Sequence, residues 1–169
     1  MAVSAGKLVI ATRKSPLALK QANWVADLVV HKMGYEVELL PMSTTGDRKA
    51  EWSLQVKGGK GLFTKELEVA LLNGKADLAV HSAKDLPTEN PDGLVLPAFP
   101  IREDSRDILV INEQVEVPQS LASGSPRRRA QLKRRFPNVL WKELRGNVET
   151  RLKKISTDKE ADGTILAAA

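Results

Sequence analysis

The chain contains no cysteine among its 169 residues, so no disulfide, thiolate metal site or thiol nucleophile can form within it. Because only two histidines are present, a histidine-rich zinc site is not expected either. No apolar run approaches the roughly 20 residues that span a bilayer, and residues 1–7 lack the pattern of a signal peptide. We therefore expect a cytoplasmic protein without a metal site and without a membrane partner.

Positive charge is in modest excess. The 26 Lys and Arg residues outnumber the 21 Asp and Glu residues, which gives a net charge of +5. This balance indicates an anionic partner but does not distinguish a nucleic acid, a membrane surface and a small acid. The length suits one ordinary domain or two small ones, and 42% hydrophobic residues are typical of a soluble globular protein.

Apolar runs alternate with helical patterns, which predicts an α/β fold with mixed sheets and helices on both faces. Strands are expected at 7–11 and 36–40, and a helix between them from Pro16 to about residue 32. Ser15 is a suitable N-cap and Pro16 suits the first helical position. The inner face of this helix is expected to comprise Leu17, Leu19, Ala22, Val25, Leu28 and Val29.

A long polar stretch with several glycines follows at 43–61, and we expect it to be a functional loop. A helix at 62–73 and a strand at 78–80 complete the first half. A change in composition near Arg102 divides the chain into a first domain, 1–101, and a second, 102–169. The second domain is expected to contain strands at 108–111, within 138–144 and at 163–167, and helices at 126–135 and 148–156.

The strand at 78–80 is followed abruptly by polar residues. His81, Ser82, Lys84 and Asp85 lie between this strand and Pro87. Ligands of open α/β sheets bind beyond the carboxyl ends of the strands, so Lys84 and Asp85 are candidates for a reaction centre. A solvated turn with a local ion pair is the alternative, and His81 fits either a structural role or that of a proton carrier.

Arginine recurs where helices begin. A helix N-terminus carries a partial positive charge, so an arginine there is unfavourable unless an anion binds. Backbone N–H groups, serine hydroxyls and arginine together suit carboxylates or phosphates. Arg151, one turn into the last helix, could face the same ligand. Three helix starts share this arrangement, namely Arg13 with Ser15, Ser125 with Arg127 and Arg128, and Arg145 with Asn147.

The basic run at 127–135 offers another interpretation. Such a helix could bind a nucleic acid. However, it contains no aromatic residue on which bases could stack before Phe136, and Lys133 and Arg134 fit a solvated face. We therefore favour an acidic small molecule with several carboxylates over a nucleic acid.

Four segments, at 10–18, 58–68, 80–87 and 144–148, together resemble the porphobilinogen deaminase family, in order and over essentially the whole chain. The resemblance implies a two-lobed architecture like the type II periplasmic binding proteins, with a third, smaller domain. It also implies a monomeric transferase of tetrapyrrole (haem or chlorophyll) biosynthesis. This enzyme, hydroxymethylbilane synthase, condenses four porphobilinogen units head-to-tail with loss of ammonia.

The same resemblance implies roles for individual residues. Asp85 would be the catalytic carboxylate, which holds pyrrole N–H groups and stabilises the cation formed as ammonia leaves. A dipyrromethane cofactor would be attached through a thioether to a cysteine of the third domain. Its acidic groups and those of the growing chain would bind Arg13, Ser15, Lys84, Ser125, Arg127, Arg128, Arg145 and Arg151. The substrate would contact Arg13, Lys60, Phe63 and Ser82, beneath a mobile loop at 43–60.

Two departures from the family pattern affect the activity that we expect of this chain. Gly124-Ser125-Pro126 stands where many members have Ser-Ser-Leu. The resemblance also implies that the sequence stops inside the second lobe, before the third domain and its cysteine anchor. We therefore expect this chain by itself to be an inactive fragment. A non-catalytic binding module for a polycarboxylate remains the alternative.

Overall fold

The computed structural model describes residues 6–48 and 61–169. The chain separates into two compact units, Met1–Pro97 and Ala98–Ala169, called unit 1 and unit 2 below. The expected domain boundary between residues 101 and 102 stays a prediction.

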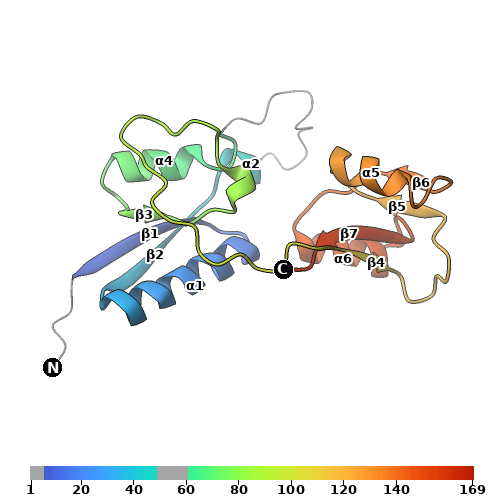
Figure 1. The fold of residues 1–169 in the computed structure, drawn as a ribbon, viewed down its shortest axis with the longest axis horizontal. Coiled ribbons are helices and arrows are strands. Elements are labelled where there is room, and N and C mark those ends of the chain that lie inside the picture. Colours follow the sequence, from blue (N-terminus) through green and yellow to red (C-terminus); the bar gives the residue numbers. More distant parts are fainter. Residues whose placement is uncertain (1–5, 49–60) are drawn as a thin grey trace. The chain divides into compact units, whose positions relative to one another are not determined.

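Unit 1 is built on a parallel sheet of three strands. The strand β1 (Lys7–Arg13) lies between β2 (Glu36–Met42) and β3 (Leu78–Ala79). A parallel pair needs a crossover connection, and the helix α1 (Pro16–Met33) provides it between β1 and β2. Helix α4 (Lys65–Leu72) packs on the opposite face of the sheet from α1 (Figure 1). The expected strand–helix–strand pattern is confirmed.

The caps of α1 follow the sequence signals. The Ala18 N–H donates to Ser15 Oγ at 3.3 Å, and Gly34 ends the helix with a φ of 74°. Ala22 and Val29 are buried as predicted, but Leu17 is 46% exposed. The prediction for Leu17 was wrong because this residue lies in the first turn, where its side chain lines a cavity instead of packing on the sheet.

The polar stretch after β2 is not the continuous loop that was predicted. Its first part contains the short helix α2 (Thr45–Arg48), while residues 49–60 lie outside the described part of the chain. Local hydrogen bonds explain this turn, because Asp47 Oδ2 accepts from the backbone N–H of Thr44 at 3.0 Å and from its hydroxyl at 2.8 Å.

The core of unit 1 lies between α4 and β1. Leu67 and Ala70 of α4 are buried against Ala11 and Ala76, and the small residues let the helix approach the strand closely. Leu67 and Ala70 therefore form the buried face of this helix.

Unit 2 contains a four-stranded mixed sheet. Strand β7 is antiparallel to β4 and parallel to β5, which in turn is parallel to β6. Helix α5 (Pro126–Lys133) and helix α6 (Val148–Ser156) complete the unit. The strands in sheet order are β4 (Asp107–Ile111), β7 (Gly163–Ala167), β5 (Ser120–Ala122) and β6 (Leu140–Lys142). All the helices and strands expected in this half are confirmed.

Close approach of backbones explains Gly163 at the start of β7. A Cβ at this position would lie 2.7 Å from the Val110 carbonyl oxygen on β4, so only glycine fits. Next to it, Asp162 Oδ2 accepts from the backbone N–H groups of Gln119 at 2.7 Å and Ser120 at 2.8 Å. These bonds fix β5 against the β7 strand.

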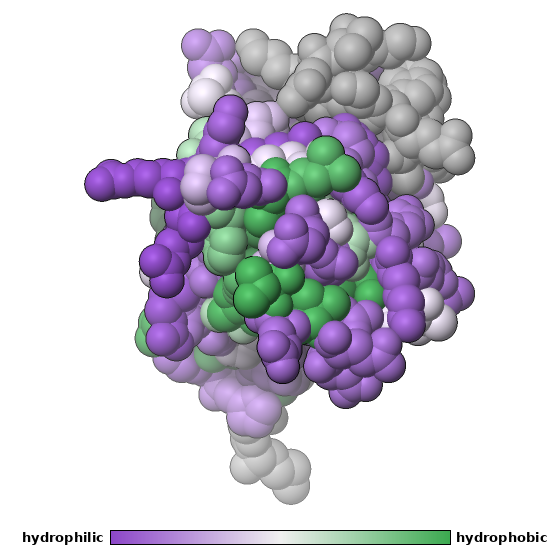
Figure 2. Space-filling model, turned by 90° about the vertical axis from the view of Figure 1, so that its right-hand side faces the viewer, coloured by the Kyte–Doolittle hydropathy of each residue, from purple (hydrophilic) through white to green (hydrophobic). Residues whose placement is uncertain are grey.

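Several large apolar side chains remain exposed. The apolar stretch at 94–99 forms no strand, and Val95 is 82% and Phe99 72% exposed. Figure 2 shows hydrophobic surface gathered on one face and bordered by hydrophilic side chains. Within the described residues, no helix has both the length and the apolar character needed to cross a membrane.

We expect Leu67→Ala to lower the free energy of unfolding by about 2–5 kcal/mol, because it leaves a cavity in the core of unit 1. The matched control is Leu72→Ala in the same helix, where the side chain is 53% exposed and the expected loss is below about 1 kcal/mol. Urea unfolding followed by circular dichroism measures both. Equal losses in the two variants would contradict the packing described here.

Candidate functional site

The segment after β3 brings the predicted reaction centre to one edge of the sheet. A short 3₁₀ turn, η1 (Ala83–Asp85), places Lys84 and Asp85 beyond the carboxyl end of β3. Arg13 is the last residue of β1, which is the parallel neighbour of β3. Parallel strands end at the same edge of a sheet, so the two segments meet although they are far apart in sequence.

A small cavity of about 70 Å³ lies at this edge. It is called the Asp85 pocket below. His81 and Gln21 also line it, so the segment after β3 and the start of α1 both contribute. Five of the residues proposed from the sequence line it together, namely Arg13, Ser15, Ser82, Lys84 and Asp85.

Asp85 faces Arg13 without a hydrogen bond between them. Arg13 Nη1 lies 3.8 Å from Asp85 Oδ2, and the side chains are 19% and 21% exposed, respectively. Hydrogen bonds between charged groups are about 2.7–2.9 Å long, so this separation gives attraction but leaves the carboxylate oxygens available to another donor.

Arg13 is held instead by Asp47. Its Nε lies 3.2 Å from Asp47 Oδ1 and 3.3 Å from Oδ2, and its Nη2 also donates to Oδ1. The guanidinium carbon lies 4.3 Å from the centre of the Phe63 ring, a cation–π contact. The role of Asp47 could not be identified from the sequence. Its contact with Thr44 is local, but Arg13, the side chain that it holds, is 34 positions away.

Phe63 and Gly46 complete the surroundings of Arg13. A Cβ on Gly46 would lie 2.2 Å from the Phe63 ring, so the absence of a side chain there makes room for this ring. Phe63 was expected near the substrate, and the structure places it against Arg13. Lys60, the other expected contact, lies outside the described residues.

Asp47, which binds Arg13, and His81, which lines the pocket, have pKa values that depart from their ordinary range. Burial raises the pKa of Asp47, but hydrogen bonds from Arg13 and Thr44 outweigh this effect and leave the pKa below its usual value. Burial lowers the pKa of His81; Asp85 and Glu68 oppose this shift, and Arg13 adds to it. The net shift favours the neutral form of the His81 imidazole.

The remaining polar residues of the pocket differ in how accessible their polar atoms are to a ligand. Ser82 Oγ donates to Gln21 Oε1 at 3.1 Å, and Ser15 Oγ caps α1. Lys84 is exposed. Of Arg13 and Lys84, the two cations that line the pocket, Lys84 is therefore the more accessible.

Unit 2 gathers guanidinium groups of like charge. Burial lowers the pKa of Arg151, and the nearby charges of Arg128 and Arg145 lower it further. Arg151 Nε donates to the Gly146 carbonyl at 2.8 Å, which directs the side chain back to the helix start. Repulsion among like charges is unfavourable, and a bound anion would offset it. This group, Arg128, Arg145 and Arg151, is called the arginine cluster below.

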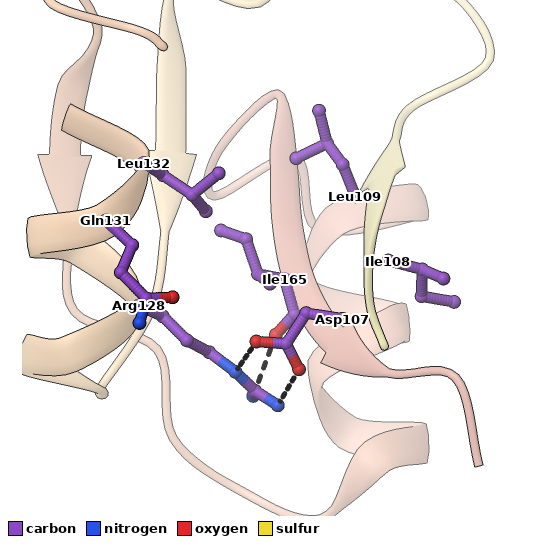
Figure 3. Close-up of a pocket in the computed structure, with 7 residues that line it drawn as sticks. All are labelled: Asp107, Ile108, Leu109, Arg128, Gln131, Leu132 and Ile165. Carbon is purple, nitrogen blue, oxygen red and sulfur yellow. Dashed lines mark hydrogen bonds and ion pairs between the residues drawn. The ribbon is translucent and has the colours of Figure 1, made fainter. Parts of the chain in front are cut away.

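Arg128 is already engaged. It reaches from α5 past β7 to Asp107 on β4, with Nε 2.8 Å from Oδ2 and Nη2 2.6 Å from Oδ1 (Figure 3). Its Nη1 donates to the Ile165 carbonyl at 3.3 Å. These groups lie at a cavity of about 140 Å³ whose other walls are largely apolar. The two-pronged pairing with Asp107 was not apparent from the sequence, and it occupies the donors that a ligand carboxylate would need.

The other predicted residues of unit 2 lie at helix starts, as expected. Ser125 Oγ accepts from the Arg128 backbone N–H at 3.4 Å, and Arg127 is exposed beside it. Arg145 Nη2 lies 3.8 Å from Glu143 Oε2. Arg129, by contrast, binds the Ser123 carbonyl at 2.5 Å and is structural. Among the described residues, no group of three or more His, Cys, Asp or Glu side chains could hold a metal ion.

Comparison with known proteins identifies relatives of the whole chain. The model of the family described as porphobilinogen deaminase, dipyrromethane cofactor binding domain, matches residues 8–169. A porphobilinogen deaminase of Sulfurimonas denitrificans is 50% identical over 169 residues, and one of Dictyostelium discoideum is 46% identical over 175 residues. Each alignment covers 96% of this chain and 54% of the relative. The chain therefore spans about half the length of these curated relatives.

A solved structure supports the fold alone. The periplasmic VFT2 domain of Bordetella pertussis BvgS matches with a TM-score of 0.50 at 16% identity, over 96% of this chain and 66% of that chain. The predicted fold class, an α/β architecture like that of type II periplasmic binding proteins, is confirmed.

The lowered pKa of Asp47 predicts a pH-dependent contribution to stability. A carboxylate with a depressed folded-state pKa stabilises the fold above its unfolded pKa of about 3.9, and this contribution is lost as the pH falls through the folded value. Asp47→Asn should therefore cost about 1–2 kcal/mol at pH 7 and progressively less below about pH 4. Urea unfolding across this pH range measures the difference. A pH-independent loss would contradict the assignment.

The arginine cluster predicts binding of a small polycarboxylate. Citrate, at ionic strength matched with sodium chloride, should raise the thermal unfolding midpoint of the chain. Arg151→Gln should reduce this rise by at least about half, because the variant loses a charged donor to the anion. Arg134→Gln, at an exposed position of unit 2, is the matched control and should retain it. Equal responses in the two variants would exclude the cluster as the site.

Proposed function

Because the chain belongs to the porphobilinogen deaminase family, we propose that it supplies the catalytic carboxylate for condensing porphobilinogen. In this reaction four units are joined head-to-tail, with loss of ammonia, to give hydroxymethylbilane. The observation that carries the proposal is the placement of Asp85 in a pocket with Arg13, at the carboxyl edge of the sheet in unit 1. The family match over residues 8–169 supports it.

The chemistry requires a fixed negative charge. When the aminomethyl group of porphobilinogen loses ammonia, the carbon–nitrogen bond breaks and its electron pair leaves with the nitrogen. The pyrrole nitrogen donates electrons to the remaining methylene carbon, so positive charge spreads over the ring and its N–H. A carboxylate held beside this N–H stabilises the developing cation more strongly than it stabilises the neutral substrate. We assign this role to Asp85.

The surroundings of Asp85 suit this role. Its side chain is 21% exposed, so it is partly shielded from water, which strengthens its interaction with a cation. Arg13 lies close enough to attract the carboxylate but does not take up its oxygens at 3.8 Å. Both oxygens therefore remain available for pyrrole N–H groups.

Acidic side groups of the substrate need cationic partners. In unit 1 we assign Arg13 and Ser82 to the substrate, and Arg13, Ser15 and Lys84 to the carboxylates of the cofactor and the growing chain. In unit 2 we assign Ser125, Arg127, Arg145 and Arg151 to carboxylates of the cofactor and the growing chain. Arg128 supports this group through its charge, because its own donors are engaged by Asp107 and Ile165.

The arginine cluster also fits the dipyrromethane cofactor that the family description names. This cofactor carries several carboxylates on linked pyrroles, and guanidinium groups are matched donors for carboxylates. When bound, it supplies the pyrrole end to which the first unit is joined. The chain contains no cysteine, so a thioether to the cofactor would need a residue outside these 169. A cytoplasmic location and a monomeric state belong to the same proposal.

A chimera tests the activity. We would fuse this chain to the remaining half of the relative that is 50% identical to it. The fusion should consume porphobilinogen and release ammonia, and Asp85→Asn should reduce turnover by about 100-fold or more. The control is Asp92→Asn, an exposed carboxylate in the following turn, which should turn over normally.

Each outcome discriminates between the functions considered. Equal turnover in the Asp85→Asn and Asp92→Asn fusions would remove Asp85 from catalysis. A folded fusion that binds porphobilinogen by calorimetry without consuming it would favour the binding-module alternative.

A further inference from the structure

We infer that Asp47 is a positioning residue for the Asp85 pocket, and that it holds the Arg13 guanidinium back from the carboxylate of Asp85. The catalytic role of Asp85 rests on the proposed function. The arrangement of Asp47, Arg13 and Asp85 is observed in the structure and does not depend on that role.

One guanidinium lies between two aspartates. Asp47 receives hydrogen bonds from Nε and Nη2, which form one edge of the Arg13 side chain. The remaining nitrogen, Nη1, is the one that lies 3.8 Å from Asp85. Asp47 therefore decides which edge of Arg13 faces the pocket.

Asp47 is anchored independently of Arg13. Thr44 donates to Asp47 Oδ2 from its backbone at 3.0 Å and from its hydroxyl at 2.8 Å, and Thr44 is fully buried. Phe63, in contact with Arg13 at 4.3 Å, limits the motion of the guanidinium. The position of Arg13 is thus set by α2 and not by Asp85.

Without the charge of Asp47, Asp85 would be the remaining ion-pair partner of Arg13 among the described residues. A movement of about 1 Å would shorten the contact from 3.8 Å to the length of a charged hydrogen bond. Arg13 would then occupy a carboxylate oxygen that a pyrrole N–H needs and would neutralise the charge of Asp85. Asp47 prevents this movement because it accepts hydrogen bonds from Nε and Nη2 of Arg13.

His81 is a reporter inside the same pocket. Its titration responds to Asp85, Glu68 and Arg13, and Lys84 also lines the cavity. The chain has only two histidines, and the other, His31, lies on α1 with its ring bound to the Asp27 carbonyl. The two imidazole signals can therefore be followed separately by NMR, with His31 as the internal reference.

The test is the NMR titration of His81 in the 169-residue chain and its Asp47→Asn variant. If Arg13 moves onto Asp85, the carboxylate no longer favours the protonated imidazole. The titration midpoint of His81 should then fall by about half a pH unit or more, while that of His31 stays unchanged. The matched control is Asp107→Asn, which releases Arg128 in unit 2 in the same way and should leave His81 unchanged.

A second variant covers the case in which Asp47→Asn does not fold. Thr44→Val keeps every charge and the side-chain shape but removes one anchor of Asp47, so a smaller fall at His81 is expected. A His81 midpoint that matches the wild type in folded Asp47→Asn, or in Thr44→Val when the former is unfolded, would overturn the inference. These readouts need no turnover, so the fusion assay tests the proposed function separately.

Discussion

The Arg13 guanidinium, shared unequally between two aspartates, is the interaction on which the candidate site depends. Asp47 takes the hydrogen bonds and Asp85 receives only longer-range attraction at 3.8 Å. A strong pair between Arg13 and Asp85 would neutralise the charge that the proposed chemistry requires. The observed separation leaves the carboxylate oxygens of Asp85 accessible to another donor.

Unit 2 contains a similar pair of an arginine and an aspartate, Arg128 and Asp107. Asp107 engages Arg128 at the edge of the sheet, so that Arg128 contributes charge to the arginine cluster while its donors are occupied. Arg151 remains close to this charge, which lowers its pKa together with burial. In both units an aspartate fixes one arginine through paired hydrogen bonds, and the proposed function assigns other cations to the acidic groups of a ligand.

Much of this organisation could be predicted from sequence because it is local. Ser15 caps its helix as expected, and Ser125 and Asn147 cap theirs in the same way, since a cap depends on residues within one turn. The position of Asp85 beyond a parallel strand followed from the strand pattern. Asp47 and Asp107 could not be found in this way, because their arginines lie 34 and 21 positions away. The helix α2 was missed because a buried threonine contact outweighs the glycine-rich composition of that stretch.

The central claim is that a pyrrole N–H binds the carboxylate of Asp85. The most direct measurement is a crystal structure of the fusion protein, carrying Asp85 unchanged, soaked briefly with porphobilinogen. The account predicts a pyrrole nitrogen within hydrogen-bond distance of Asp85 and the guanidinium of Arg13 still bound to Asp47. A ligand bound elsewhere, with Asp85 paired directly to Arg13, would contradict it.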